Sequence, residues 1–537
     1  MRIIPLVLTA VVLLASVWFG GAARLADDGE VTIELVDSAT GRNLPGIIRV
    51  MNDQQQVVPL PGLMNRGLGI EAAGPIHDWH VLPAKSTVRL PAGRYTVHGL
   101  QGVETEQGEA AMVVERGGRH SVRVPLVRFY DSAARGKRSG NTHLHLQKLP
   151  RVEADRYLTD VPKVDGLDLL FVSFLERIDA DREYITNEYT RDDLRRLGDR
   201  GVPIANGEEY RHNFTGWGEG YGHVMFLDLP RLIRPASFGV GIMKTGSDGQ
   251  TLRDGIDNAR QQGSTIIWCH DQWGYEDIPN WVMGRLQANN IFDGGTHGSY
   301  QHSFYRYLNA GLKTPFSTGT DWFQYDFSRV YIPATTAPTA QDFLKRVAEG
   351  RTMITNGPLL ELRIEGREIG ETLDLPRGGK VVVEAKGLGR VDFGRIELVK
   401  NGAVIEQVQC APEVRHYAAS ARWEVNLADP CWLALRTPPP PVKKFPELNP
   451  PVKQNELGND LFAHTSAIFV DIAGRHVFDL PTAESLLAEM QENRRLIAAK
   501  ADFSNDTERL RVLNVHDEAI AEWTQRIKDN RKNAKPQ

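Results

Sequence analysis

Two histidines separated by one residue, His143 and His145, are the residues of this chain whose spacing points most directly to chemistry. Side chains two positions apart on a β-strand point to the same face, so both imidazoles can reach one point at a strand end. Imidazole nitrogen binds zinc, iron and other transition-metal ions. An isolated His-x-His pair is as often a pair of hydrogen-bonded histidines, so the motif predicts a metal site only if further ligands follow later strands.

Acidic and histidine side chains do follow, at the ends of later apolar or β-branched runs. They are Glu208, Glu209, His223, His270 and Asp321. Taken singly, each has an ordinary alternative, such as a solvated turn, a strand edge or a helix cap. Taken together they predict one site, because active-site groups of α/β barrels gather at the carboxyl ends of the strands.

In order and residue type, this series resembles the PHP (polymerase and histidinol phosphatase) superfamily of metal-dependent hydrolases, and most closely its CehA/McbA family. That family opens with a strand ending in His-x-His. It continues with Gly-x-Glu, Gly-His and a strand-end histidine, and it closes with an Asp-containing turn. Residues 140–357 carry the match in order. The resemblance implies an α/β fold built on a distorted seven-stranded (β/α) PHP-type barrel.

The sequence departs from the family where one of up to three metal sites would lie. Arg151, Leu175 and Phe323 stand where family members carry histidine or aspartate. Lys148, Arg151 or Arg177 could supply positive charge there instead, although solvated side chains are the simpler interpretation.

The resemblance implies that two metal sites are retained. One comprises His143, His145, Glu209 and Asp321, and the other comprises Glu209, His223 and His270. Glu209 bridges the two sites in this interpretation, and we prefer it to Glu208 because it fits the Gly-x-Glu spacing. We expect two divalent ions, zinc first, with manganese or iron as alternatives, because four histidines disfavour magnesium.

Such a pair of ions would activate a water molecule for attack on a carbonyl or phosphoryl centre, since metal binding lowers the pKa of water to about 7. Asp321 could accept a proton from this water. Arg211 and His212 follow Glu209 closely and could orient the substrate or stabilise charge in the transition state. For both residues a purely structural role is equally consistent with the sequence.

The expected substrate is a small molecule with an ester, amide, carbamate or phosphoester bond, as the family implies. Loss of the third metal site disfavours a phosphoester, because phosphoryl groups benefit from several cationic contacts. The alternative is a non-catalytic exported binding protein, with a PHP barrel that has lost its activity.

The first 26 residues resemble a secretory signal peptide. Arg2 precedes an uncharged apolar run over residues 3–23 that closes with small residues. This run is also about long enough to serve as an N-terminal membrane anchor. We therefore expect export to the periplasm or the cell exterior. Cys410 and Cys431 could pair in such an oxidising compartment, or both could be free thiols. We expect Cys269 to be buried and to face away from its strand neighbour His270.

The rest of the chain must position this site. Its 537 residues and net charge of −5 indicate a multidomain protein with no reason to bind nucleic acid. No feature of the sequence indicates an oligomeric state. Pattern and turn residues predict four regions after the N-terminal segment: a β-sandwich resembling the carboxypeptidase-regulatory type over 29–130, the barrel over 138–357, a β-rich domain with a Pro-rich loop over 358–480, and a helical tail over 482–537.

Overall fold

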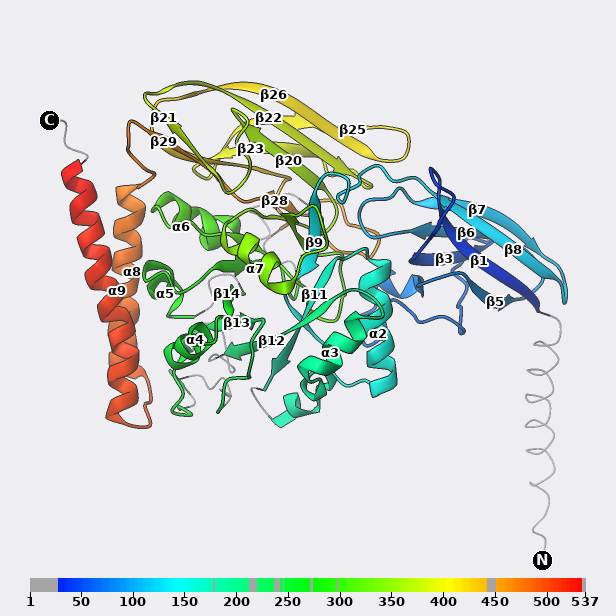
Figure 1. Cartoon of the computed structure of the whole chain (residues 1–537), viewed down its shortest axis with the longest axis horizontal. Helices are drawn as coiled ribbons and strands as arrows, with labels where there is room; N and C mark the ends of the chain where they lie inside the picture. The colour runs from blue at the N-terminus through cyan, green and yellow to red at the C-terminus, as the bar shows by residue number, and fades with distance from the viewer. Residues whose placement is uncertain are drawn as a thin grey trace, which may run out of the picture. The chain divides into compact units, whose positions relative to one another are not determined.

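The computed structural model describes residues 28–176, 179–211, 220–235, 242–244, 246–270, 274–295, 298–441 and 451–533. These residues form a mixed α/β protein that ends in two long helices (Figure 1), which confirms the predicted class and the helical tail. They divide into two compact units. The smaller contains residues up to 68, 73–129 and 163–166, and the larger contains 69–72, 130–162 and the chain from 167 onward. Residues 1–26 lie outside the described part of the chain.

The smaller unit is built from two antiparallel or mixed sheets that share one apolar core. Along β1, alternate residues Val31, Ile33 and Leu35 are buried, and they pack with Ile48 and Val97 of the other sheet. This alternation is what a strand with one buried face requires. The first sheet contains β2 (Asn43–Leu44), β1 (Gly29–Asp37), β5 (Ser86–Leu90) and β8 (Arg119–Leu126). The second contains β4 (His80–Leu82), β3 (Gly46–Asn52), β6 (Gly93–Leu100) and β7 (Gly108–Val114), with a short 3-10 helix at Pro75–Asp78.

A buried ion pair ties residues 163–166 to the smaller unit. Arg66 Nη2 lies 2.6 Å from Asp165 Oδ2, and neither side chain is appreciably exposed to solvent. A charge in a protein interior needs an opposite charge beside it. The pair therefore helps to hold residues 163–166, at and just after the end of the helix at 151–164, in this unit.

The larger unit is organised around a series of neighbouring strands. In spatial order they are β9 (Lys137–Asn141), β11 (Leu169–Leu175), β12 (Ile204–Arg211), β13 (His223–Leu227), β14 (Thr265–Cys269), β15 (Ala288–Asn290) and β16 (Phe316–Ser317). Neighbours run parallel, except that β13 is antiparallel to both β12 and β14. Strands from β11 to β16 therefore place most of their carboxyl ends at one edge.

A short strand pair bridges the two ends of this series. β10 (Leu144–His145) follows β9, β17 (Asp321–Trp322) follows β16, and β10 and β17 pair in parallel. The backbone N–H groups of Thr320 and Asp321 both donate to the carbonyl of His143, at 3.0 and 2.9 Å. The first and last strands of the series thus meet where the predicted ligands lie.

Helices pack against both faces of these strands. Ile266 and Trp268 of β14 share one core with the helices at 252–261 and 277–282, whereas Ile267 and Cys269 share the other core with the helix at 340–348. Helix α4 begins after Thr251, whose side chain accepts a hydrogen bond from the Asp254 N–H. The helices here are α2 (Arg151–Val164), α3 (Arg191–Gly198), α4 (Leu252–Gln261), α5 (Asp277–Val282), α6 (Arg306–Asn309) and α7 (Ala340–Ala348), with short 3-10 or π turns at Asp179–Glu183, Ile185–Glu188 and Gln301–Tyr305.

The same sheet continues into the C-terminal β region. It passes from β9 through β18 (Arg329–Pro333), β19 (Met353–Thr355), β28 (Ala463–Thr465), β27 (Cys431–Arg436) and β23 (Arg395–Lys400) to β24 (Ala403–Gln409), and β29 (Ile468–Ile472) joins β27 to β21 (Thr372–Leu375). A separate sheet contains β20 (Leu359–Ile364), β22 (Gly379–Gly389), β26 (Tyr417–Leu427) and β25 (Ala411–Pro412). Cys410 and Cys431 are free thiols.

Two helices, α8 (Leu480–Lys500) and α9 (Asp506–Asn533), lie side by side at the end of the chain (Figure 1). Leu486 and Met490 of α8 and Trp523 of α9 are buried in the core that also holds Ile256 of α4. The helical tail therefore packs against the rest of the larger unit. No helix in the described ranges has the length and hydropathy needed to cross a membrane.

Candidate metal centre

The structure brings all six predicted metal ligands together. Ligand atoms of His143, His145, Glu209 and Asp321 lie within 4.8 Å of one another, and so do those of Glu209, His223 and His270. All six side chains belong to residues that are at most 6% exposed. These buried groups could hold a metal ion, and Glu209 belongs to both sets.

Strand alternation decides which of two adjacent carboxylates enters the cluster. Glu209 points into it, whereas Glu208 points to the opposite face of β12, where its Oε2 accepts a hydrogen bond from the Ile233 N–H at 2.7 Å. Burial raises the pKa of Glu208 to about 8. The preference for Glu209 over Glu208 thus agrees with the position of each side chain.

Three of the imidazoles are held through Nδ1, which leaves Nε2 directed at the cluster. The Nδ1 of His143 lies 2.8 Å from Asp293 Oδ2, and that of His270 lies 3.0 Å from Asp293 Oδ1. The Nδ1 of His145 lies 2.8 Å from the carbonyl oxygen of Ser173. A hydrogen bond at one ring nitrogen fixes the tautomer and makes the other nitrogen a ligand. The sequence-derived ligands therefore have the supporting contacts that metal-binding histidines normally have.

The first set converges tightly. His143 Nε2 and His145 Nε2 are 3.0 Å apart, and His145 Nε2 is 3.0 Å from Glu209 Oε2. Asp321 Oδ1 lies 3.4 Å from His143 Nε2 and 3.7 Å from His145 Nε2. This oxygen is buried and accepts no hydrogen bond from any described residue. Two imidazole nitrogens and two carboxylate oxygens this close together require a positive charge among them.

The second set uses the other oxygen of Glu209. Glu209 Oε1 lies 3.6 Å from His223 Nδ1 and 3.8 Å from His270 Nε2. Because Oε2 faces the first set and Oε1 faces the second, the carboxylate is placed as a bridge. His270 Nε2 is also 3.8 Å from Asp321 Oδ2, so Asp321 borders both sets.

The electrostatics of the cluster favour bound positive charge. Burial by itself would lower the pKa of His143, but Asp321, Asp293 and Glu209 outweigh burial and raise this pKa to about 10. The pKa of His270 is also raised, because Asp293 and Asp321 again outweigh burial. Burial would raise the pKa of Glu209, but Arg211 and the two neighbouring histidines hold it well below its usual range. The negative charge of these buried carboxylates would stabilise either a proton or a metal ion in the cluster.

Asp321 has a backbone conformation that is uncommon for a residue with a side chain. Its φ is +58°, and the φ of Phe323 is +54°. Non-glycine residues rarely adopt such angles, and such strain often accompanies functional sites. The β10–β17 pairing holds this turn in place, so the carboxylate of Asp321 is presented to the histidines by the fold.

The sequence interpretation missed Asp293, which joins His143 of the first set to His270 of the second. Asp293 is fully buried, and the two histidines hold its pKa far below its usual range although burial acts in the opposite direction. The only available signal was its position three residues after β15, a strand of three residues. So short a strand leaves no recognisable alternation.

The orientation expected for Cys269 was wrong. Its Sγ lies within 4.8 Å of ligand atoms of both His143 and His270, instead of facing away from His270. The thiol is buried, as expected, and burial raises its pKa well above the usual value. β14 ends at Cys269, so the alternation rule no longer applies to the next residue.

Of the residues expected to take part in catalysis, Asp321 and Arg211 lie at the ligand cluster, and His212 lies outside the described residues. Arg211 Nη1 is 3.1 Å from Glu209 Oε1, and its side chain is largely buried. This arginine therefore borders the second set and would compete with a bound metal ion for Glu209 Oε1.

The basic residues considered for the third metal site are engaged elsewhere. Arg151 pairs with Asp155 at 2.9 Å and lies over the ring of Tyr189, and Lys148 pairs with Glu183. Lys148 is exposed, as the simpler interpretation expected, whereas Arg151 is half-buried among its partners, and Arg177 lies outside the described residues. Leu175 and Phe323 are buried apolar residues.

Comparison with protein-family models and with curated sequences finds no match. Among solved structures, the shaft pilin SpaA of Lactobacillus rhamnosus GG is 10% identical with a TM-score of 0.12, and the alignment covers 19% of this chain and 46% of the pilin. The β-glucuronidase of Parabacteroides merdae is 10% identical with a TM-score of 0.14, over 79% of this chain and 59% of the enzyme. This chain thus spans only about half the length of each. At these TM-scores neither likeness bears on fold or function.

Proposed function

We propose that this chain is an exported metal-dependent hydrolase of the PHP type, which uses two divalent ions to cleave an ester, amide, carbamate or phosphoester bond of a small molecule. The observation that carries this proposal is the position of Glu209. Its two oxygens face two separate buried ligand sets, one with His143, His145 and Asp321 and one with His223 and His270.

The strand arrangement supports the proposed barrel. The strands from β9 to β16 form a continuous series, and the β10–β17 pair bridges its ends. The candidate ligands gather at this bridge, and α/β barrels bind their substrates at the carboxyl ends of their strands. The N-terminal and C-terminal β regions are proposed as β-sandwich domains that flank this barrel, and residues 1–26 as a signal peptide or membrane anchor.

The donor set fits zinc best. Four imidazoles with two carboxylates are typical of zinc, manganese or iron sites, whereas magnesium prefers oxygen ligands throughout. The first ion would be held by His143, His145 and Asp321, the second by His223 and His270, and both by Glu209. Asp321 Oδ1, which is buried without a hydrogen-bond donor among the described residues, supports this assignment.

Two divalent ions held by these residues would supply a water molecule of lowered pKa and positive charge for the oxygen that becomes negative. Asp321 borders both ligand sets, so its Oδ2 would be the base placed to accept a proton. Arg211 reaches the cluster from the same face of β12 as Glu209, so its guanidinium can hold a substrate oxygen. Asp293 keeps two imidazoles in their ligand tautomer.

One observation favours a second candidate, a non-catalytic binding protein with a degenerate barrel. The ion pair between Arg211 and Glu209 places a fixed positive charge beside the bridging carboxylate, which weakens the need for a second metal ion. In this alternative the chain binds one metal ion or none and hydrolyses nothing.

Metal analysis combined with a substrate panel separates the two candidates. We expect the purified full chain to carry about two equivalents of zinc, manganese or iron, and to hydrolyse at least one phosphoester, carboxyester, amide or carbamate. His270→Ala should abolish hydrolysis, whereas His476→Ala should not, because His476 is 77% exposed and pairs only with Asp471. A metal-free protein that is inert on every bond type would refute the proposal.

A further inference from the structure

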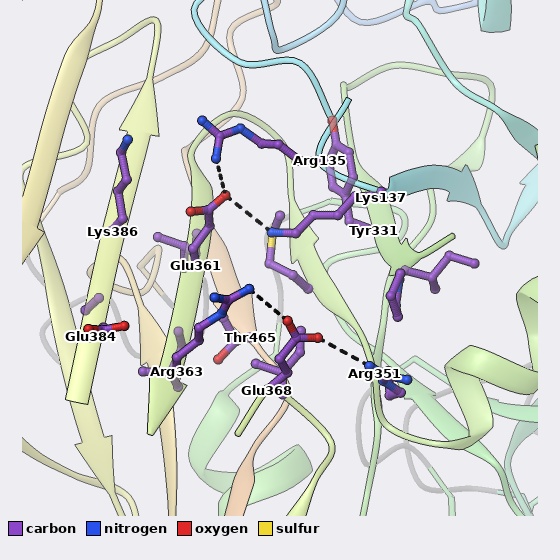
Figure 2. Close-up of a pocket in the computed structure, with 18 of the residues that line it drawn as sticks. Arg135, Lys137, Tyr331, Arg351, Glu361, Arg363, Glu368, Glu384, Lys386 and Thr465 are labelled. Atoms are coloured by element: carbon purple, nitrogen blue, oxygen red, sulfur yellow. Dashed lines mark hydrogen bonds and ion pairs between the residues drawn. The ribbon is translucent and has the colours of Figure 1, made fainter. Parts of the chain in front are cut away.

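A cleft of about 610 Å³ lies in the larger unit, between the start of β9, β18 and β19 on one side and the β20–β22 face on the other. Figure 2 shows the charged side chains along its walls. It contains none of the residues of the candidate metal centre. We propose that this cleft is a second ligand site, which binds a small organic molecule with two oxyanion groups.

Charge is the first argument for an anionic ligand. The lining contains five cationic side chains, Arg135, Lys137, Arg351, Arg363 and Lys386, and three carboxylates, Glu361, Glu368 and Glu384. The cleft therefore has an excess of two positive charges. A concave surface with one sign of charge in excess attracts ligands of the opposite sign.

Each of two carboxylates already has two cationic partners (Figure 2). Glu361 Oε1 lies 3.2 Å from Arg135 Nη1 and 3.7 Å from Lys137 Nζ. Glu368 lies 3.3 Å from Arg351 and 3.0 Å from Arg363, through a different oxygen for each. Each carboxylate together with its two cationic partners therefore carries a net charge of +1.

Two of the cations have donors to spare. Arg363 is 61% exposed and uses only Nη2, in its bond to Glu368. Lys386 lies opposite Glu361 and helps to lower the pKa of that carboxyl, but among the described residues it makes no hydrogen bond or ion pair within 4 Å. A guanidinium and an ammonium with unused N–H groups are the usual partners of carboxylate and phosphate oxygens.

The strand register places these two donors at a useful spacing. Glu361 pairs with Lys386 and Arg363 pairs with Glu384 across β20 and β22. Alternate residues share a face, so Arg363 and Lys386 are diagonal neighbours on the side that faces the cleft, about 7–8 Å apart at the backbone. Each can therefore hold one end of the same short ligand.

The remaining lining favours an organic ligand over inorganic anions. Pro333 and Ile369 are partly exposed apolar residues in the lining, between the charged groups. A ligand with an apolar spacer between two oxyanion groups buries this surface and satisfies both cations. Dicarboxylates and phosphorylated carboxylates share this chemistry.

The cleft is separate from the metal centre. Lys137 begins β9 and lies in the cleft, whereas His143 follows the end of that strand. The lining of the cleft includes none of the candidate ligands, so the two sites share no residue. The proposal does not depend on hydrolytic activity.

Calorimetric titration of the full chain with two probes tests this proposal. Glutarate represents a dicarboxylate and 3-phosphoglycerate a phosphorylated carboxylate, with neutral glutaramide as the control. We expect one molecule of at least one anion to bind per chain and glutaramide not to bind. The tighter of the two anions identifies which oxyanion the site prefers.

Variants locate the binding. Arg363→Ala with Lys386→Ala should weaken anion binding at least tenfold, because each substitution removes a charge-assisted hydrogen bond. Lys380→Ala is the matched control, since Lys380 lies on the same face of β22 but outside the cleft and pairs with Glu424. His270→Ala should leave binding unchanged. Should the double variant misfold, Lys386→Gln alone should still weaken binding.

Three results would overturn the proposal. One is the absence of binding of both anions at millimolar concentration. Another is unchanged affinity in the double variant and in Lys386→Gln. The last is an equal loss of affinity in Lys380→Ala or in His270→Ala, which would place the anion elsewhere on the protein.

Discussion

Asp293→Asn is the substitution that most directly tests the geometry of the metal centre. Asp293 Oδ2 accepts a hydrogen bond from His143 Nδ1 at 2.8 Å, and Asp293 Oδ1 forms an ion pair with His270 Nδ1 at 3.0 Å. Asparagine keeps the shape but replaces one oxygen by an NH2 group, which cannot accept. One of the two histidines must then carry its proton on Nε2, where the proton blocks a metal ion.

The expected loss follows from this change of tautomer. Removing the hydrogen-bond partner of a metal-binding histidine typically lowers metal affinity about 10–100-fold, which corresponds to about 1.4–2.7 kcal/mol. His143 belongs to one ligand set and His270 to the other. We therefore expect one of two bound ions to weaken by this amount while the other changes less.

Competition with a chromogenic chelator, after loading with zinc, resolves two binding steps and measures the loss for each. Asp471→Asn is the matched control, because Asp471 pairs with His476 Nδ1 at 2.7 Å outside the cluster. It should leave both affinities unchanged. The reasoning is refuted if Asp293→Asn binds both ions as tightly as the parent, or if the control loses as much.

Other predictions concern stability, pH and the second ligand set. Asp165→Asn should destabilise the fold by about 3–5 kcal/mol in chemical denaturation, because it leaves the buried Arg66 charge without its partner; a loss below 1 kcal/mol would contradict this. Burial raises the pKa of Glu276 from 4.5 to about 8. The unfolded chain then loses its proton first, so this residue destabilises the fold progressively as pH rises from about 4.5 to 8, by up to about 1.4 kcal/mol per pH unit. Glu276→Gln should remove this pH dependence of stability, so the melting temperature of the variant minus that of the parent should rise between pH 5 and 8. A difference in melting temperature that does not change with pH would contradict the assignment of Glu276 as a buried carboxyl that stays protonated. Arg211→Ala should tighten binding of the second ion at Glu209, because it removes the competing cation, and it should slow hydrolysis of any substrate found. Metal titration measures the first effect and steady-state kinetics the second. Weaker metal binding in this variant would contradict the idea that Arg211 competes with the ion.

Much of the candidate site could be predicted from the sequence because strand periodicity is local. The His-x-His pairing depends only on the rule that side chains alternate along a strand, whereas the choice of Glu209 over Glu208 depends on the Gly-x-Glu spacing of the family that the chain resembles. Both outcomes agree with the positions seen in the structure. The mixed α/β class and the helical tail follow from similarly local patterns.

The rule failed where the strands are short or have ended. Cys269 is the last residue of β14, so alternation did not fix its direction relative to His270. Asp293 follows a strand of three residues and carries no motif. The division of the chain could not be foreseen either, because Asp165 joins the smaller unit through a partner 99 residues away in sequence.

By itself, the sequence determined which residue types stand at the strand ends and that four histidines and two carboxylates suit a transition metal. Only the tertiary structure decided that they share one buried point, because the bridge between β10 and β17 joins segments about 175 residues apart. It also decided that one aspartate holds histidines of both sets, and that Arg363 and Lys386 face a common cleft. Such relations arise from pairing between distant strands, and no local pattern in the chain encodes them.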